Sequence, residues 1–262
     1  MELYGLIGKS LKHSFSREYF KQKFAEEKID ADYRFYEMDE LVDLQNLFAS
    51  EPELKGLNVT IPYKRAVLHQ LDELSDTAEI TGSVNVIKAY RKNGKTVLKG
   101  FNTDAIAFEA SIHPLIKKRN NLRALILGSG GAAHSVAYVL RKRGIYFYFV
   151  SRKPQKVETM TYHWITEQTI KEFKLIINTT PMGTFPKVDE KPEIPYSELT
   201  SEHILYDLIY NPPETSFLKE GKNRGAQIKN GYEMLKIQAE ESWKIWQSKK
   251  GTINEHNHFR LW

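Results

Sequence analysis

The segment ALILGSGGAAHS, residues 124–135, constrains the fold more than any other part of the chain. A short apolar run stops at Gly128, and a helix-forming run begins at Ala132. A buried strand that enters a helix through Gly128, Gly130 and Gly131 brings backbone N–H groups close to a bound group. The positive end of the helix dipole then favours a phosphate anion. A tight strand–helix connection without a ligand is the alternative interpretation of the same glycines.

The residues after this turn continue a βαβ unit. Helix-like sequence extends to Arg143, and the apolar run 145–150 predicts the next strand. That run ends in Ser151-Arg152-Lys153. An NAD site usually carries an Asp or Glu at this point for the ribose 2′-hydroxyl, whereas two cations suit a 2′-phosphate. The sequence therefore predicts a Rossmann-type domain that binds NADP rather than NAD.

Length and composition restrict the class of protein. The 262 residues can bury one large core or two modest ones, and 41% hydrophobic residues is a globular value. No apolar run reaches the ~18 residues of a membrane span, and the start lacks a secretory h-region, so we expect a cytoplasmic protein. Without cysteine the chain has no disulfide or thiolate metal site. The net charge of +5 comes from scattered basic residues, which predicts no nucleic-acid partner.

Strands and helices alternate along the first hundred residues, which is typical of an α/β layer. The expected strands lie at 3–7, 33–38 and 54–59, with helices at 17–27 and 41–48 between them. A further helix is expected to open near Pro62, because proline is common at the first helical position. Asn93-Gly94 between two apolar runs is a hairpin signal, which predicts an antiparallel edge for this sheet.

The segment GLNVTIPYK, residues 56–64, places polar side chains where a predicted strand ends. Asn58 and Thr60 lie at the carboxyl end of that strand, and in an α/β sheet this end faces the ligand crevice. Lys64, about one turn into the expected helix, either turns back toward the crevice or is an ordinary solvated lysine.

Two other polar segments also follow strands. GFNTD, residues 100–104, ends one strand and opens a helix. Asp104 is therefore either a residue of the active site or the N-cap of that helix. KHSFS, residues 12–16, brings two hydroxyls and an imidazole into the loop after the first strand, and by itself it would be interpreted as a turn.

Together these segments resemble the shikimate dehydrogenase family over nearly the full chain. Eight motifs occur in the family's order: KHSFS (12–16), GLNVTIPYK (56–64), GSVNVI (82–87), GFNTD (100–104), GSGGAA (128–133), INTTPMG (177–183), YNPPETSFL (210–218) and GYEMLKIQ (231–238). The resemblance implies reversible NADPH-dependent reduction of 3-dehydroshikimate to shikimate, in the biosynthesis of aromatic amino acids. The implied partners are this small substrate and NADP(H), and the protein would be a monomer or a homodimer.

The resemblance also implies a role for each matching residue. Lys64 and Asp104 would be the catalytic pair beside the substrate's reacting oxygen, and which of them transfers the proton stays open. The substrate-binding residues would be Ser14, Ser16, Thr60, Asn85, Tyr210 and Gln238. The cofactor-binding residues would be Gly128, Ser129, Gly130, Gly131, Ala132, Ser151, Arg152, Lys153, Thr179, Met182 and Gly231. Ketone reduction needs a proton donor and charge stabilisation, which a lysine ammonium provides, so no metal is predicted.

The implied fold class is α/β in three parts. Residues 1–104 would form an α/β substrate-binding and catalytic domain, and residues 105–234 a Rossmann-type NADP-binding domain. Residues 235–262 would form a C-terminal helix that packs back on the first domain, although residues 249–262 match nothing in the family. A further departure is Ala105-Ile106-Ala107, where the family commonly has a glycine-containing turn.

Two alternatives remain open. A quinate/shikimate dehydrogenase that uses NAD would have the same fold, but Arg152 and Lys153 favour NADP. A non-catalytic homologue that senses a pathway metabolite would also keep the fold. The presence of both Lys64 and Asp104 disfavours it, because a sensor needs no proton-transfer pair.

Overall fold

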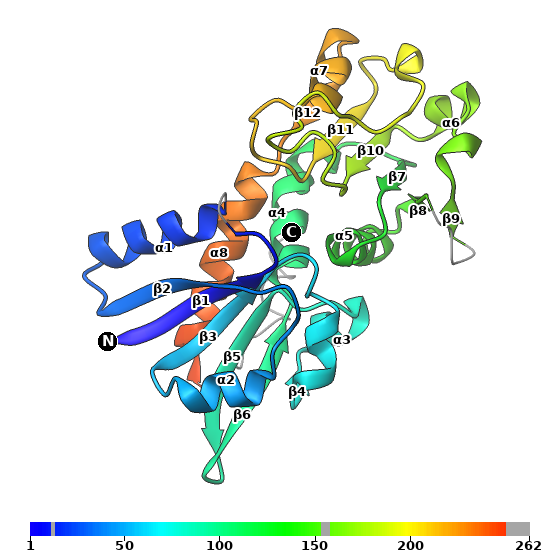
Figure 1. The fold of residues 1–262 in the computed structure, drawn as a ribbon. Coiled ribbons are helices and arrows are strands. Elements are labelled where there is room, and N and C mark those ends of the chain that lie inside the picture. Colours follow the sequence, from blue (N-terminus) through cyan, green and yellow to red (C-terminus); the bar gives the residue numbers. More distant parts are fainter. Residues whose placement is uncertain (12–13, 153–157, 250–262) are drawn as a thin grey trace. The chain divides into compact units, whose positions relative to one another are not determined.

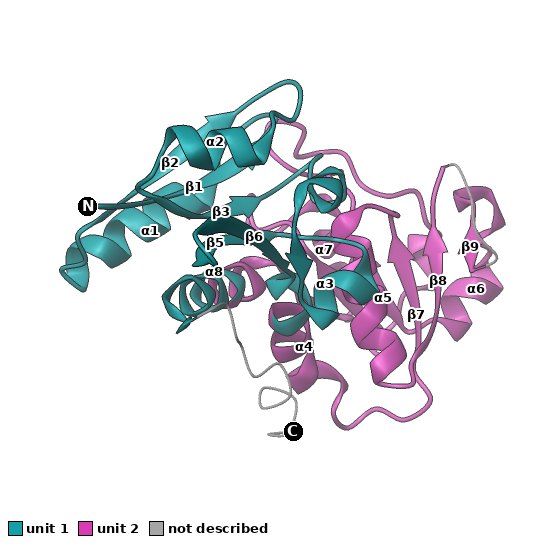
Figure 2. Cartoon of the chain, turned by 90° about the horizontal axis from the view of Figure 1, so that it is seen from below, with its two compact units in different colours: residues 1–106, 238–262 teal, residues 107–237 magenta. Residues whose placement is uncertain are grey.

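A computed structural model describes residues 1–11, 14–152 and 158–249 (Figure 1). The chain forms two compact units (Figure 2), one of residues 1–106 with the chain from 238 on, the other of residues 107–237. Each unit contains a six-stranded sheet with helices, so the α/β fold class is confirmed. The predicted changes of domain, after residues 104 and 234, lie beside the two points where the chain passes between units.

The sheet of the first unit has the strand order β2-β1-β3-β5-β6-β4. Its strands are β1 (Glu2–Gly8), β2 (Ala31–Glu37), β3 (Leu54–Val59), β4 (Glu73–Leu74), β5 (Val86–Lys92) and β6 (Lys95–Phe101). Strand β1 pairs in parallel with β2 and β3, whereas β5 pairs antiparallel with β3 and β6. The predicted hairpin is confirmed: Lys92 pairs with Lys95, and Asn93 (φ 52°) and Gly94 (φ 78°) form the turn. Positive φ at both central residues matches the twist of the flanking strands.

Helices cover both faces of this sheet. They are α1 (Phe15–Glu26), α2 (Leu44–Ser50), α3 (Asp76–Thr81), the 3₁₀ helix η1 (Ala66–Gln70), the start of α4 (Thr103–Ile116) and the end of α8 (Tyr232–Gln247). Side chains alternate along β1, so Leu3 and Ile7 join a core with Leu44 of α2, while Tyr4 and Leu6 join a core with α1 and α8. Because each face of β1 contacts a core, nearly every residue of this strand is apolar.

The segment around Pro62 differs from the expected helix. Residues 61–65 form turns, and η1 begins only at Ala66. The Lys64 carbonyl accepts a hydrogen bond from the Val84 N–H at 2.7 Å, so it is directed to a distant segment rather than to the next helical turn. The helix prediction is wrong here because a tertiary hydrogen bond replaces a local one.

The sheet of the second unit has the strand order β12-β11-β10-β7-β8-β9, and its pairs are parallel. Its strands are β7 (Arg123–Leu127), β8 (Tyr146–Val150), β9 (Thr159–Met160), β10 (Leu175–Asn178), β11 (Ile204–Asp207) and β12 (Gln227–Lys229). The chain runs outward from β7 to β9 on one side and then from β10 to β12 on the other. The strand order therefore reverses between β7 and β10, where doubly wound sheets open a ligand crevice.

Helices of the second unit are α5 (Gly131–Lys142), α6 (Glu167–Glu172), α7 (Ser216–Asn223) and the remainder of α4, with 3₁₀ helices η2 (Tyr162–Trp164) and η3 (Tyr196–Glu198). Leu125, Ile176 and Leu205 lie at one register on three neighbouring strands and join a buried core with α6 and α7. The predicted βαβ unit is confirmed as β7, α5 and β8. The sequence pattern predicts neither α6 nor α7, and Phe173 is the C-cap of α6.

Helix α8 begins at Tyr232, three residues before the start expected for the C-terminal helix, and ends at Gln247. Its last turn lies in the first unit, where the Lys88 ammonium donates to the carbonyls of Ile245 (2.9 Å) and Trp246 (2.8 Å). A cation at the negative end of a helix dipole satisfies carbonyls that have no partner within the helix. Within the described part of the chain, no helix is long and apolar enough to cross a membrane.

Candidate active site

The predicted catalytic side chains of the first unit are in direct contact. Lys64 lies in the turn after β3, and Asp104 is the second residue of α4. Lys64 Nζ donates to Asp104 Oδ2 at 2.6 Å, and the two side chains are 17% and 7% exposed. A charge-assisted bond with so little solvent access is much stronger than a surface ion pair. The alternative of a solvated Lys64 is wrong for this structure.

Asn85 holds the other side of the Asp104 carboxylate. Its Nδ2 donates to Asp104 Oδ1 at 2.9 Å and to Thr103 Oγ1 at 2.8 Å, and its Oδ1 accepts from the Thr103 N–H at 2.7 Å. Gln238 Oε1 lies 3.5 Å from the same Asn85 nitrogen. Four predicted site residues thus form one connected group, and Thr103, which the sequence did not single out, joins them.

Asp104 does not cap its helix. The Asn102 side chain accepts a hydrogen bond from the Ala105 N–H at 3.2 Å, which is the bond that a helix N-cap makes. The alternative interpretation of Asp104 is therefore wrong, and its carboxylate faces Lys64 instead. Ala105, Ile106 and Ala107 are buried residues of α4, so this departure from the family pattern lies inside a packed helix.

Three further predicted substrate residues lie in the first unit. Ser14 is the N-cap of α1 and accepts from the Ser16 N–H at 3.4 Å. Ser16 is buried, and its hydroxyl hydrogen-bonds to Tyr33. Thr60 follows β3, and its N–H donates to the Ile7 carbonyl at 2.9 Å. Lys12 and His13 of the same serine-containing loop lie outside the described residues.

The glycine turn of the second unit fits only glycine at its first position. Gly128 has φ +112°, and a Cβ there would lie 2.6 Å from Thr179 Oγ1. Thr179 donates to the Leu127 carbonyl through its N–H (2.9 Å) and its hydroxyl (2.7 Å). These contacts join the carboxyl ends of β7 and β10, where the strand order reverses. Two predicted cofactor residues therefore meet at the reversal of strand order, where doubly wound sheets bind ligands.

The start of α5 fits a bound pyrophosphate. Gly130 is the N-cap, a Cβ there would meet nothing within 4 Å, and within the described residues no side chain caps the helix. Open space and backbone N–H groups at a helix N-terminus suit an anion. Ser129 Oγ donates to Ser151 Oγ at 3.3 Å, which links the turn to the end of β8 beside the exposed Arg152. Lys153 lies outside the described residues.

Three more predicted residues follow the strands β10, β11 and β12. The Met182 carbonyl accepts from Asn178 Nδ2 at 3.4 Å, and Tyr210 lies in the loop after β11. Gly231 precedes α8, and its N–H donates to the Ile209 carbonyl at 3.0 Å. A Cβ on Gly231 would lie 2.0 Å from the Leu208 carbonyl oxygen, so this position also requires glycine.

A buried carboxylate that the sequence did not single out lies at the ends of β10 and β11. Asp207 accepts from Asn178 Nδ2 (3.1 Å), the Ile209 N–H (3.0 Å) and the Thr215 hydroxyl (2.6 Å). Burial raises the pKa of Asp207 to about 6, and the three donors oppose that rise. Asn178 and Asp207 are polar residues at the carboxyl ends of parallel strands, the same signal that identified Thr60.

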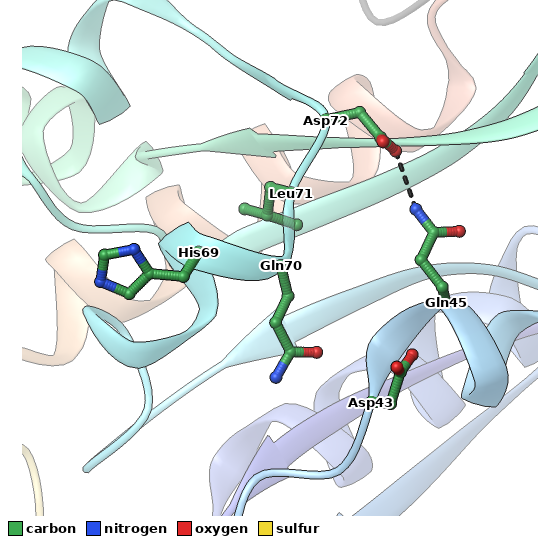
Figure 3. A pocket seen from close by; sticks show the side chains of 6 residues that line it. All are labelled: Asp43, Gln45, His69, Gln70, Leu71 and Asp72. Atoms are coloured by element: carbon green, nitrogen blue, oxygen red, sulfur yellow. Dashed lines mark hydrogen bonds between the residues drawn. The ribbon is translucent and has the colours of Figure 1, made fainter.

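A polar pocket of about 430 Å³ lies beside α2 (Figure 3). Its lining residues are Asp43, Gln45, His69, Gln70, Leu71 and Asp72. Gln45 Nε2 donates to Asp72 Oδ2 at 2.9 Å, the same oxygen accepts from the Leu98 N–H, and Asp43 caps α2. These side chains hold α2 and β6 in place. Among the described residues, no group of three or more His, Asp or Glu side chains could hold a metal ion.

Comparisons with known proteins extend over both units. The family model of the shikimate dehydrogenase substrate binding domain matches residues 6–87. A curated shikimate dehydrogenase (NADP(+)) from Clostridium beijerinckii is 41% identical over 259 residues, 94% of this chain and 92% of that protein. The crystal structure of shikimate dehydrogenase from Aquifex aeolicus matches with a TM-score of 0.81 and 34% identity, covering 94% of this chain and 92% of the other. A quinate dehydrogenase from Corynebacterium glutamicum in complex with NAD matches with a TM-score of 0.81 and 26% identity, covering 94% and 93%.

The similarity is not limited to the substrate binding domain that the family model describes. A protein 41% identical over 94% of the chain shares the second unit as well as the first. The resemblance predicted from the eight motifs is thereby confirmed. The chain belongs to the shikimate dehydrogenase family.

Proposed function

We propose that this protein catalyses the reversible, NADPH-dependent reduction of 3-dehydroshikimate to shikimate. The observation that carries the proposal is the Lys64–Asp104 pair, held by Asn85, in a chain 41% identical to a shikimate dehydrogenase (NADP(+)). Its partners in this proposal are small molecules, the substrate and NADP(H). A monomeric or homodimeric state and a cytoplasmic location remain predictions.

The pair supplies the proton chemistry of ketone reduction. NADPH, when bound, supplies the hydride that adds to the ketone carbon. Negative charge then develops on the ketone oxygen, and the Lys64 ammonium stabilises it beside a nearly buried carboxylate. A proton from the pair converts that oxygen to the hydroxyl of shikimate, and the pair regains a proton from solvent. Either member can be the one that transfers the proton.

The remaining polar residues of the first unit bind the substrate in this proposal. Ser14 and Ser16 contact its carboxylate, its ring hydroxyls contact Thr60, Asn85 and Gln238, and Tyr210 contacts its edge. Asn85 also holds Asp104 at 2.9 Å, so the same side chain joins substrate binding to the catalytic pair. Orientation by fixed groups is what makes a bound ketone reactive.

The second unit holds the cofactor in this proposal. The pyrophosphate lies on Gly128, Ser129, Gly130, Gly131 and Ala132, where the N-terminus of α5 favours an anion. Ser151, Arg152 and Lys153 contact the adenosine 2′-phosphate, while Thr179, Met182 and Gly231 line the cofactor cleft. The assignment of Gly128 and Gly231 to the cofactor site is supported by the close contacts that a Cβ would make at each position.

One assay separates this proposal from its alternatives. The purified chain is assayed for kcat/KM with shikimate and with quinate, each with NADP⁺ and with NAD⁺. We expect shikimate with NADP⁺ to give the highest value. A preference for NAD⁺ would support a quinate/shikimate dehydrogenase instead, as in the related quinate dehydrogenase that was solved with NAD. Tight shikimate binding without any turnover would identify a metabolite sensor.

A further inference from the structure

A buried amide in β3 connects three segments of the first unit. Asn58 is 4% exposed, and its Oδ1 accepts a hydrogen bond from the Tyr33 hydroxyl at 2.8 Å. Its Nδ2 donates to the Asn85 carbonyl at 3.3 Å and to Ser242 Oγ at 3.0 Å. The amide therefore uses its oxygen and both of its N–H groups inside the protein.

The hydrogen bonds around this amide have only one possible direction. Ser242 Oγ donates to the Gln238 carbonyl at 2.7 Å, so it can only accept from Asn58. The Tyr33 hydroxyl donates to Asn58, so its oxygen accepts from Ser16. Because the chain of bonds ends on backbone carbonyls, each hydroxyl proton has a fixed position. A buried polar network that is satisfied in this way rigidifies the segments it joins.

Every end of this network lies on a segment that carries a proposed substrate-binding residue. These segments are the start of α1 with Ser16, the start of β5 after Asn85, and α8 with Gln238. Tyr33 and Ser242 themselves are 0% exposed, so neither can contact a substrate. We infer that Tyr33 and Ser242 are positioning residues for substrate binding that act through the amide of Asn58. The inference rests on the proposed function, since it takes those three segments as the substrate-binding surface.

Loss of either hydroxyl should loosen the amide and thereby the substrate-binding surface. Ser242→Ala removes one acceptor of Asn58 Nδ2 and the side-chain donor to the Gln238 carbonyl. Tyr33→Phe leaves Asn58 Oδ1 buried without a donor but keeps the ring, which stacks on Phe20 at a centroid distance of 4.7 Å. A buried amide oxygen without a donor is energetically costly, which favours a rearrangement that supplies a partner. We expect each variant to raise the Kd for shikimate by about fivefold, because small displacements of binding groups have large effects.

The second unit offers a matched control. Tyr206 is also 0% exposed, and its hydroxyl lies 2.6 Å from the hydroxyl of Ser111. Both residues belong to the second unit, whereas the hydrogen bonds of Asn58 lie in the first. Tyr206→Phe removes an equally buried tyrosine hydroxyl. We expect it to lower thermal stability as Tyr33→Phe does, while the Kd for shikimate stays within about twofold of the wild type. The Kd for NADP⁺ serves as an internal control in each variant.

The decisive experiment is a double-mutant cycle in the full chain, with Kd values from calorimetry. Because both residues act through Asn58, the double variant should raise the Kd for shikimate by less than the product of the two single effects. Ser242→Thr, which keeps the hydroxyl, should restore most of the affinity. Unchanged Kd values in both single variants, a strictly multiplicative double variant, or an equal effect of Tyr206→Phe would overturn the inference. These results would leave the proposed function intact, whereas a wild-type chain that neither binds nor turns over shikimate would overturn both.

Discussion

Asp104 lies between two donors: Lys64 Nζ at 2.6 Å from one carboxylate oxygen and Asn85 Nδ2 at 2.9 Å from the other. The carboxylate is thus fixed in orientation, and through it the ammonium is fixed as well. The backbone carbonyl of Lys64 accepts a hydrogen bond from the N–H of Val84, the neighbour of Asn85. This bond fixes the turn that carries Lys64. The geometry therefore predicts a proton donor with little freedom to move, which is what general acid catalysis requires.

Lys64→Met should remove the ammonium of the catalytic pair while it leaves the volume of the side chain nearly unchanged. We expect kcat to fall by about 10²- to 10⁴-fold, the usual contribution of a positioned acid or base. The Kd for shikimate should change little, because the proposed binding residues stay in place. Steady-state assays give kcat, and calorimetry gives the Kd. Full turnover of this variant would show that the lysine is not catalytic.

Gly128→Ala should weaken NADP⁺ binding. The new Cβ would meet Thr179 Oγ1 at 2.6 Å, and φ +112° is unfavourable for alanine, so the turn must shift. If this shift costs about 1.4 kcal/mol of binding free energy, the Kd for NADP⁺ increases about tenfold. Gly144→Ala is the control, because Gly144 has φ +68° but open space around it. Equal NADP⁺ affinities of the two variants would contradict the proposed pyrophosphate turn.

Arg152→Asp should change the choice of cofactor. The exposed guanidinium is proposed to pair with the 2′-phosphate, which NAD lacks, and a carboxylate there would repel that phosphate. We expect kcat/KM with NADP⁺ to fall by about tenfold or more, the equivalent of one charge-assisted hydrogen bond, while the value with NAD⁺ changes far less. The measurement is the ratio of the two values in wild type and variant. A parallel fall with both cofactors would argue against a 2′-phosphate contact.

The features that the sequence predicted well are those set by local rules. The strand, glycine turn and helix at 123–142 follow from an apolar run and a helix start, and the Asn93-Gly94 hairpin follows from backbone preferences at two residues. The catalytic pair was identified through the resemblance alone. Lys64 and Asp104 are 40 residues apart, and no periodicity links them.

The features that could not be predicted depend on contacts between distant segments. Asn58 and Ser242 are 184 residues apart, so their hydrogen bond has no local signal. The turn at Lys64 replaces the expected helix because the N–H of Val84, in another segment, donates a hydrogen bond to the Lys64 carbonyl. Helix α6 has only six residues, which is too short for an amphipathic period to be visible. Asn178 and Asp207, in contrast, end parallel strands, and the strand-end rule applied to them would have identified the buried network.

The buried Asp207 predicts a specific dependence of stability on pH. Burial raises its pKa in the native protein to about 6, from an ordinary value of 3.8. Between these values the native state holds a proton that the unfolded chain has released. The contribution of Asp207 to the free energy of unfolding therefore decreases as the pH rises from about 4 to about 6, because the native state binds more protons at this group over this interval.

Asp207→Asn isolates this contribution, because the amide stays uncharged over the whole range. We expect the difference in unfolding free energy, wild type minus variant, to become smaller as the pH rises from 4 to 6, and then to level off. Urea unfolding at half-unit steps of pH measures it. Because the carboxylate accepts from Asn178, Ile209 and Thr215, the variant also loses acceptors, which shifts the whole curve without changing its slope. A difference that stays constant, or grows with pH, would mean that these three donors outweigh burial and keep the carboxyl ionised.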